Sequence, residues 1–232
     1  MPLSVWAAPA GDPRNPWFSW SYIRNNIETL TTALQEHVTL TVVTIAVATA
    51  IAIPLAVLAN RVRWLAGPIL ASTGVLYTIP SLALFALLGP TLGLSFATAA
   101  IGLILYALLA IARNALTGLQ QVPPEVRDAA RGMGYSRAAM LWRIELPLAL
   151  PSIMTGLRIA TVSTVALVTV CAIVGYGGLG TVMVNGFYTN YYKPQIMTGA
   201  LGCVGLALIF DLALIGLGRL VMPWARRRGG SA

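Results

Sequence analysis

The sequence predicts an all-α integral membrane protein with five transmembrane helices, an amino-terminal interfacial helix and a two-helix cytoplasmic loop. Three observations support this prediction. Of the 232 residues, 57% are apolar and only 9% are charged, whereas a soluble domain has roughly 45 to 50% and about 25%. Five apolar stretches are long enough to cross about 30 Å of hydrocarbon at about 1.5 Å per residue. The arginines lie mainly in the connections between those stretches.

Residues 1–37 are expected to form an extracytoplasmic amino-terminal segment. Its apolar side chains recur at helical spacing at Ile23, Ile27, Leu30 and Leu34, and Trp17, Phe18 and Trp20 lie at the start. Such a stripe ahead of a membrane span is typical of an amphipathic helix lying in the membrane interface. A plain amino-terminal extension of the first span fits the same spacing equally well.

The transmembrane domain is expected over residues 38–222. Its connections differ in length, because two of them are tight turns whereas residues 117–152 form one long segment. A connection of that length usually has a function of its own. The five spans are expected at residues 38–59, 65–88, 95–116, 153–174 and 197–222.

Basic residues are distributed unequally between the two sides of the membrane. One side collects Arg61, Arg63, Arg127, Arg131, Arg137, Arg143, Arg226, Arg227 and Arg228, and the other has Arg14, Arg24 and Lys193. Because cytoplasmic segments contain the excess of Lys and Arg, the amino terminus is expected outside and the basic tail, residues 223–232, in the cytoplasm. A net charge of +8 would indicate nucleic-acid binding in a soluble chain. Arginines between spans are better explained as topology determinants. We therefore expect the chain to contact membrane lipid and not nucleic acid.

The first half of the long segment has the signals of a short helix. Pro123 and Pro124 suit a helix start, and Glu125 and Arg131 suit the two ends of the helix dipole. A helix is therefore expected over 124–133. Its narrow apolar face consists of Val126, Ala129, Ala130 and Met133. Two alanines at the centre permit close approach, so this face is expected to dock into another protein; folding back onto the ends of the spans is the alternative.

The second half of the segment predicts another short helix. Gly134 is placed to end the first helix in the left-handed conformation. Ser136 is placed to cap a second helix. That helix is expected to run to Ile144, ahead of Pro147.

These residues resemble a known motif. The stretch DAARGMGYSRAAMLWRIELP fits the pattern EAA, three residues, Gly, nine residues, I-x-L-P of binding-protein-dependent ABC importer permeases. The positions are occupied by Asp128, Ala129, Ala130, Gly134, Ile144, Leu146 and Pro147. The departure is Asp128 in place of the usual Glu, which shortens the reach of the carboxylate.

The resemblance extends over residues 38–222 to permeases of the osmoprotectant importers for glycine betaine, carnitine and choline. The similar stretches are TIPSLALFALLGP from Thr78, YALLAIARNALTGL from Tyr106, LPLALPSIMTGLRIATV from Leu146 and IVGYGGLG from Ile173. Tyr77 precedes the first of them where Gln is usual.

This resemblance implies the fold of a type I ABC importer permease in a bacterial cell membrane. It implies three partners: a second permease subunit, identical or not, a dimer of ATPase subunits that binds ATP and Mg²⁺, and a separate extracytoplasmic substrate-binding protein. It also implies that the loop helix sits in a groove of the ATPase and acts as a lever on the spans. Residues 117–152 would then be an ATPase-coupling loop, with Val126 and Met133 on its docking face.

The chain itself is expected to be neither an enzyme nor a cofactor-binding protein. It has no G-x-x-x-x-G-K-[ST] phosphate loop, so it is not the ATP-hydrolysing partner. It has one histidine, His37, and its two cysteines lie inside apolar runs, so no metal site is expected.

The segment GYGGLG spells the G-x-G-x-x-G pattern with Gly175, Gly177 and Gly180, and it includes Gly178. A dinucleotide site needs a strand before the glycines and an acidic residue about 20 positions after them, whereas here a membrane span precedes and the acidic residue is missing. The glycines are therefore interpreted as a tightly packed turn at the outer end of the fourth span. They serve either as structure or as part of a gate.

Several polar residues inside the spans are candidates for the transport pathway. A kink at Pro80 would place Tyr77, Thr78 and Ser81 near the middle of the membrane. Because quaternary ammonium groups favour aromatic faces, Tyr77 and Tyr106 are candidate pathway residues.

Charged residues inside the spans are the other candidates. Asp211 lies in the fifth span, where an ionised carboxylate is costly. Protonation, a contact with a neighbouring helix and a cationic substrate in a water-filled pathway would each relieve that cost, and the helix contact is favoured. Arg113 and Arg158 are explained by snorkelling toward the interface.

The sequence thus predicts a permease subunit of an ABC importer for an osmoprotectant such as glycine betaine, choline or carnitine. An ABC permease for an amino acid or another small polar solute is the alternative within that class. A secondary carrier or channel subunit is the alternative outside it. A membrane-embedded enzyme is discounted, because no paired carboxylates or histidine cluster lie at one depth.

Overall fold

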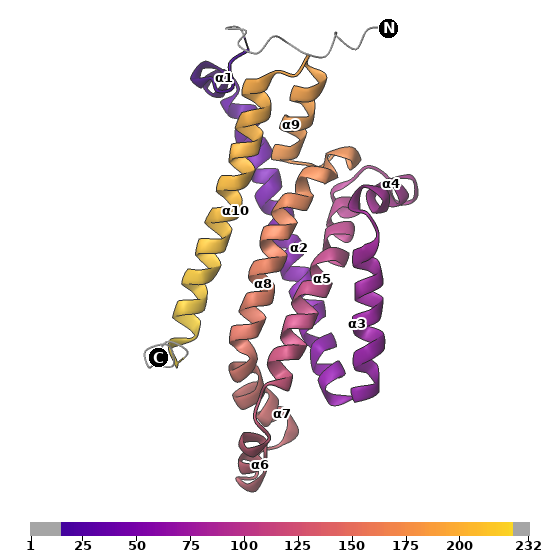
Figure 1. Cartoon of the computed structure of the whole chain (residues 1–232), viewed down its shortest axis with the longest axis vertical. Helices are drawn as coiled ribbons and strands as arrows, with labels where there is room; N and C mark the ends of the chain where they lie inside the picture. The colour runs from indigo at the N-terminus through magenta and orange to yellow at the C-terminus, as the bar shows by residue number, and fades with distance from the viewer. Residues whose placement is uncertain (1–14, 225–232) are drawn as a thin grey trace.

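A computed structural model describes residues 15–224, apart from the side chains of Arg63 and Leu76, and every regular element in this part of the chain is a helix (Figure 1). Arg14 and residues 225–232, which include the three arginines of the predicted basic tail, lie outside the described residues. The helices of the first half are α1 (Trp20–Asn25), α2 (Ile27–Arg61), α3 (Arg63–Thr78), α4 (Ser81–Leu92) and α5 (Phe96–Gln120). Those of the second half are α6 (Pro124–Gly132), α7 (Arg137–Met140), the π turn η2 (Leu141–Glu145), α8 (Leu146–Val168), the 3-10 turn η3 (Thr169–Val174), α9 (Leu179–Tyr188) and α10 (Lys193–Val221).

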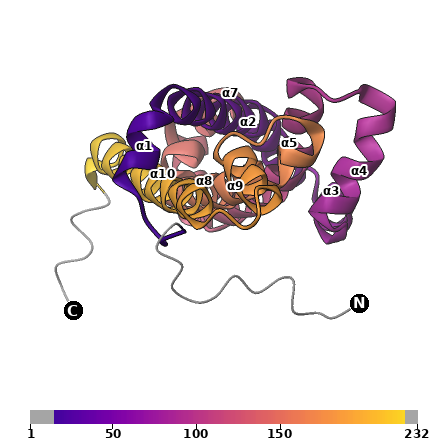
Figure 2. The same ribbon diagram turned by 90° about the horizontal axis from the view of Figure 1, so that it is seen from above.

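The helices α2, α5 and α8 form the centre of the bundle. α3 and α4 flank α5 on one side, and α10 flanks α8 on the other (Figures 1 and 2). α6 and α7 lie at one end of the bundle, here named the loop end, and α1 and α9 lie at the opposite end, named the far end (Figure 1). Two long helical runs connect these ends without interruption, α2 and the run from Arg137 to Val174.

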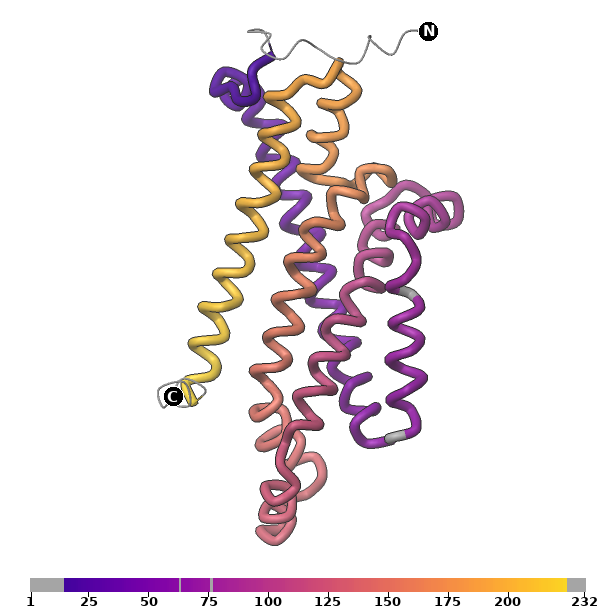
Figure 3. Tube along the Cα trace, in the orientation of Figure 1, coloured from indigo at the N-terminus to yellow at the C-terminus, as the bar shows by residue number. Residues whose placement is uncertain are grey.

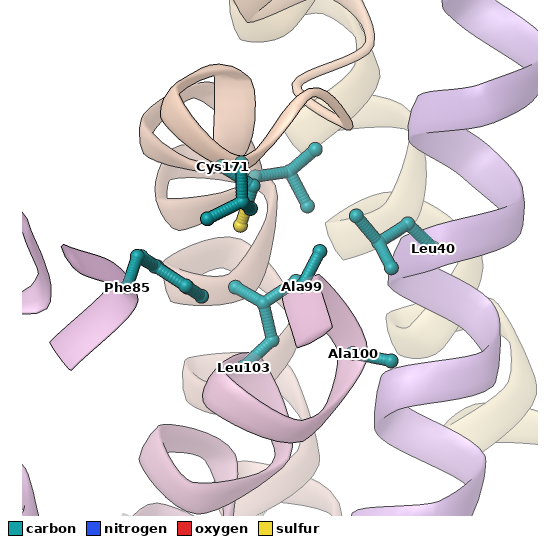
Figure 4. Packing of buried hydrophobic residues seen from close by; sticks show 8 residues of the cluster. Leu40, Phe85, Ala99, Ala100, Leu103 and Cys171 are labelled. Atoms are coloured by element: carbon teal, nitrogen blue, oxygen red, sulfur yellow. The ribbon is translucent and has the colours of Figure 1, made fainter. Parts of the chain in front are cut away.

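Small residues allow the central helices to approach closely. Four buried alanines of α2 face α5 and α8, which suits helix packing in a membrane, where van der Waals contact replaces the hydrophobic effect. They are Ala48, Ala52, Ala56 and Ala59. Toward the far end the packing uses larger side chains, and Figure 4 shows Phe85 of α4 pointing at Leu103 of α5 beside Cys171.

The predicted all-helical membrane fold is confirmed, with differences in the first span. Four helical runs of the described chain are long and apolar enough to cross a membrane. The first of them, α2, already begins at Ile27, so the alternative of an extension of the first span is correct for residues 27–37. Only α1 is a separate helix, capped by Ser19, whose Oγ accepts a hydrogen bond from the backbone N–H of Tyr22 at 3.2 Å.

The second predicted span is interrupted. α3 ends at Thr78 and α4 begins at Ser81, and the chain changes direction between them (Figure 3). Pro80 has no N–H to continue the helix, and it disfavours helical geometry at Ile79, whose ψ is 126°. α3 has 16 residues, about 24 Å at 1.5 Å per residue, which is short of a full span.

The predicted second loop helix is not a separate helix. The sequence predicts that it ends at Ile144, but the chain stays helical from Arg137 to Val174 through Pro147 and Pro151. The π turn η2 lies directly ahead of Pro147. The wider π turn tolerates the missing backbone N–H of Pro147, so this proline does not end the helix.

Candidate functional site

The loop end is built around α6, which lies at the tip of the molecule beyond the bundle (Figure 1). Its end has the predicted cap: Gly134 has a φ of +81°, the N–H of Gly134 donates to the carbonyl of Arg131, and the N–H of Tyr135 donates to the carbonyl of Ala130. Ser136 caps α7 by accepting a hydrogen bond from the N–H of Ala139. The local signals of the sequence therefore determine the path of this loop.

The predicted apolar face of α6 divides into two parts. Ala130 is fully buried, whereas Val126 is 37% and Met133 is 68% exposed, and Ala129 is exposed as well. On the same helix Asp128 forms a surface ion pair with Arg131 at 3.0 Å. Three members of the face are thus accessible to a partner protein.

A buried carboxylate joins α6 to the bundle. The side chain of Glu145, in the π turn, is 5% exposed and lies 3.2 Å from the guanidinium of Arg61 at the end of α2 and 3.2 Å from that of Arg127 on α6. Arg127 also donates to the carbonyl of Leu119 at 2.6 Å, and Arg61 to the carbonyl of Arg137 at 3.2 Å. Sequence patterns alone do not reveal this cluster, although a carboxylate at the border of an apolar run indicates a need for partners.

The motif residues after α6 lie along the continuous helix. Ile144, Leu146 and Pro147 are half-buried beside Glu145, and Leu146 packs against the cluster of Ala149 and Ile153. The two halves of the motif therefore meet at the loop end, one on α6 and the other at the start of the longest helical run.

The pathway candidates of the second span meet α5 in the bundle. The hydroxyl of Tyr106 donates to the carbonyl of Ile79 at the break between α3 and α4, and the rings of Tyr77 and Tyr106 lie 5.7 Å apart at 72°. The hydroxyl of Thr78 donates to the carbonyl of Val75 at 2.7 Å, and Ser81 is the first residue of α4. The structure thus brings Tyr77 and Tyr106 together, whereas the hydroxyl of Thr78 is hydrogen-bonded to the backbone of its own helix.

The glycine segment forms the predicted turn at the far end of the fourth span. η3 ends in the left-handed conformation at Gly175, with a φ of +82°. A Cβ at Gly177, Gly178 or Gly180 would lie 2.3 to 2.7 Å from Ala172, His37 or Thr169. These three glycines are therefore required by close packing. α9, which follows the turn, was not predicted.

Asp211 forms a two-point ion pair with Arg158. Its oxygens accept hydrogen bonds from Nε and from the terminal nitrogen of Arg158 at 2.7 and 2.9 Å. The preferred interpretation of Asp211 as a contact between helices is confirmed. For Arg158 snorkelling is the expectation, and the structure gives its guanidinium a carboxylate partner on α10.

The comparison with protein families decides the identity of the chain. Residues 30–227 match the family described as binding-protein-dependent transport system inner membrane component. The chain belongs to this family. Membership agrees with the motif at residues 128–147, and it makes this inner membrane component a permease subunit of an ABC importer, in which ATP hydrolysis belongs to a separate chain.

Named relatives cover most of this inner membrane component. The osmoprotectant import permease protein OsmW of Salmonella typhimurium is 35% identical over 207 residues, which are 87% of this chain and 96% of OsmW. The glycine betaine/carnitine/choline transport system permease protein OpuCD of Bacillus subtilis is 36% identical over 199 residues, 84% of this chain and 87% of OpuCD. These relatives agree with the ABC permease interpretation and not with a secondary carrier or channel.

A solved structure has the same fold. A chain of the inward-facing MetNI methionine ABC transporter superposes with a TM-score of 0.75 and covers 85% of this inner membrane component and 98% of the transporter chain. The sequence identity is 22%, so this likeness establishes the type I permease fold alone.

Proposed function

We propose that the chain forms the translocation pathway of an ABC importer for quaternary ammonium osmoprotectants such as glycine betaine, choline or carnitine. Relatives named for these solutes are similar over most of their length and most of this chain. The assembly would contain a second permease subunit, an ATPase dimer that holds ATP and Mg²⁺, and a separate extracytoplasmic binding protein.

The observation that supports the coupling role most directly is the exposed face of α6. Val126, Ala129 and Met133 are accessible at the tip of the molecule, while Arg127 on the same helix is held at Glu145. A partner that moves α6 therefore acts at once on the start of the continuous helix that runs to Val174. This is the behaviour that a lever between an ATPase and the spans requires.

We also propose that the loop end faces the cytoplasm and the far end faces outward. The basic residues Arg61, Arg127, Arg131, Arg137 and Arg143 all lie at the loop end, as the positive-inside rule requires of cytoplasmic segments. In this orientation α6 and its partner ATPase are on the side of the membrane where ATP is available.

The experiment is substitution on the exposed face of α6 in the complete transporter. Because Ala129 is exposed, Ala129→Glu adds no clash within the chain but places a charge in the docking surface. Gly134→Val forces a β-branched residue into a φ of +81° and disrupts the end of the helix. Both variants are expected to reach the membrane at normal levels and to lose at least about tenfold in ATP-dependent uptake, the equivalent of about 1.4 kcal/mol of coupling.

Matched controls are available at the same positions. Ala129→Ser keeps a small side chain, and Gly134→Asn tolerates the left-handed conformation, so both are expected to retain most of the uptake. Normal uptake and normal solute-stimulated ATPase activity in Ala129→Glu and Gly134→Val would contradict the coupling role of α6.

A further inference from the structure

A cavity of about 180 Å³ lies between α3, α5 and α8. Its wall combines aromatic, polar and apolar side chains, among them Tyr77, Tyr106, Ala110, Arg113, Asn114 and Ser163. The volume is below the about 300–1,000 Å³ of pockets for drug-sized ligands. The cavity therefore suits a small solute.

One end of the cavity is aromatic. The ring of Tyr106 is buried, and its hydroxyl is held by the carbonyl of Ile79. Tyr77 packs against it edge to face and keeps 48% of its surface exposed. Such a fixed pair of electron-rich rings attracts a cation whose charge is spread over methyl groups, because this cation gives up little hydration when it meets a ring face.

The other end of the cavity carries a positive charge. Arg113 lies seven residues after Tyr106 on the same face of α5, about 10 Å along the helix axis, and it lines the cavity. None of the ion pairs among the described residues includes Arg113. A guanidinium within an apolar span needs an anionic partner or a route to water. Arg113 is exposed as well as lining the cavity, so its guanidinium is available to an anionic group that enters beside the two tyrosines.

We infer that this cavity binds the transported solute as a zwitterion, with its quaternary ammonium group at Tyr77 and Tyr106 and its carboxylate at Arg113. The inference rests on the proposed function and extends it to solute choice within this chain. A guanidinium binds a carboxylate through two parallel hydrogen bonds, and choline has no carboxylate to offer. Arg113 then favours glycine betaine and carnitine over choline.

The test compares two solutes in one complex. Permease, ATPase and binding protein are reconstituted in proteoliposomes, and ATP-driven uptake of radiolabelled glycine betaine and choline is measured for the wild type and for Arg113→Gln. Because the same binding protein serves both complexes, its own preference cancels when the two uptake ratios are compared. We expect the ratio of glycine betaine to choline uptake to fall at least about tenfold, since a charge-assisted hydrogen bond is lost.

Three further variants separate the role of the positive charge from that of the aromatic ring and from a general effect of charge. Arg113→Lys retains a cation and is expected to keep more of the glycine betaine preference than Arg113→Gln. Tyr77→Leu removes a ring and is expected to lower uptake of both solutes, because both contain the quaternary ammonium group. Arg24→Gln removes an equal charge from an exposed position on α1 and is expected to leave the ratio unchanged.

Other outcomes overturn the inference. If Arg113→Gln lowers the uptake of both solutes equally, Arg113 serves structure, or the second permease subunit fills the cavity. If Arg113→Lys and Arg113→Gln have the same ratio of glycine betaine to choline uptake, the positive charge at residue 113 does not select between the two solutes. A wild-type complex that imports neither solute overturns the proposed function itself, whereas an unchanged ratio in a working complex overturns this inference alone.

Discussion

At the scale of single residues, the position of α6 depends on Glu145. Its carboxylate is 5% exposed, and its two arginine partners come from α2 and α6, elements that the sequence separates widely. A buried charge is tolerated only when such partners are present. The same residue also lies in the π turn that starts the long helical run, so it joins three parts of the chain at one point.

Replacing Glu145 by Gln is expected to destabilise the protein by about 2 kcal/mol. Removing one partner of a buried pair costs about 3–5 kcal/mol, and we expect less because Arg61 and Arg127 are partly solvent-exposed and screened. The measurement is the midpoint of thermal unfolding of the purified protein in detergent. Arg131→Gln is the control, because it breaks an exposed pair worth less than about 1 kcal/mol. Equal decreases in the unfolding midpoint for the two variants would contradict the stabilising role of the buried Glu145 carboxylate.

At the scale of elements, the far end depends on close contact between η3, α9 and α2. A Cβ at Gly180 would lie 2.3 Å from the Cα of Thr169, and one at Gly178 would lie 2.7 Å from the Cβ of His37. His37 in turn contacts the carbonyl of Val165 at 3.0 Å. The glycines thus allow the backbone of the turn to lie directly on two helices.

Gly180→Ala is expected to destabilise the fold by about 1–3 kcal/mol, the usual cost of overpacking. The clash is with backbone atoms of Thr169, which cannot rotate away as a side chain would. Gly205→Ala on α10 is the matched control, because nothing lies within 4 Å of a Cβ built there, and a helical alanine is favoured over glycine. The two thermal midpoints in detergent are compared. A Gly180→Ala protein as stable as the control would show that the turn is not tightly packed.

The sequence predicted the elements that rest on local signals. The caps at Gly134 and Ser136 and the glycine turn at Gly175 each depend on a few neighbouring residues, and the structure confirms all three. At Pro80 the sequence predicts a kink within one span, whereas the structure has a break between α3 and α4. The coupling motif could be recognised for the same reason, since its residues are close together along the chain.

The remaining features depend on contacts between distant segments. Pro147 looked like a stop signal because its effect depends on the π turn ahead of it, which periodicity does not show. Asp211 was expected to have a partner on another helix, but nothing in the sequence indicates that α8 and α10 are adjacent, so Arg158 could not be named. The cluster at Glu145 was missed for the same reason.

At the scale of the whole molecule, the two ends of the bundle differ in chemistry. The loop end has α6 with its exposed face and the arginines around Glu145. The far end has aromatic contacts, such as that of Tyr22 with Tyr192. Burial, and in second place the nearby Tyr192, raises the pKa of the Tyr22 hydroxyl. A single orientation in the membrane follows if the positive charges stay in the cytoplasm.

Labelling of single cysteines tests that orientation. Gly132→Cys lies at the loop end in open space, and Thr189→Cys is exposed at the far end. In right-side-out membrane vesicles, a membrane-impermeant maleimide is expected to label Thr189→Cys at once and Gly132→Cys only after the vesicles are opened. The native cysteines lie inside helices, one buried and one half-buried, so the unmodified protein serves as the blank. Labelling of Gly132→Cys in sealed vesicles would place α6 outside, where no ATPase could reach it, and would rule out the lever that the proposed function requires.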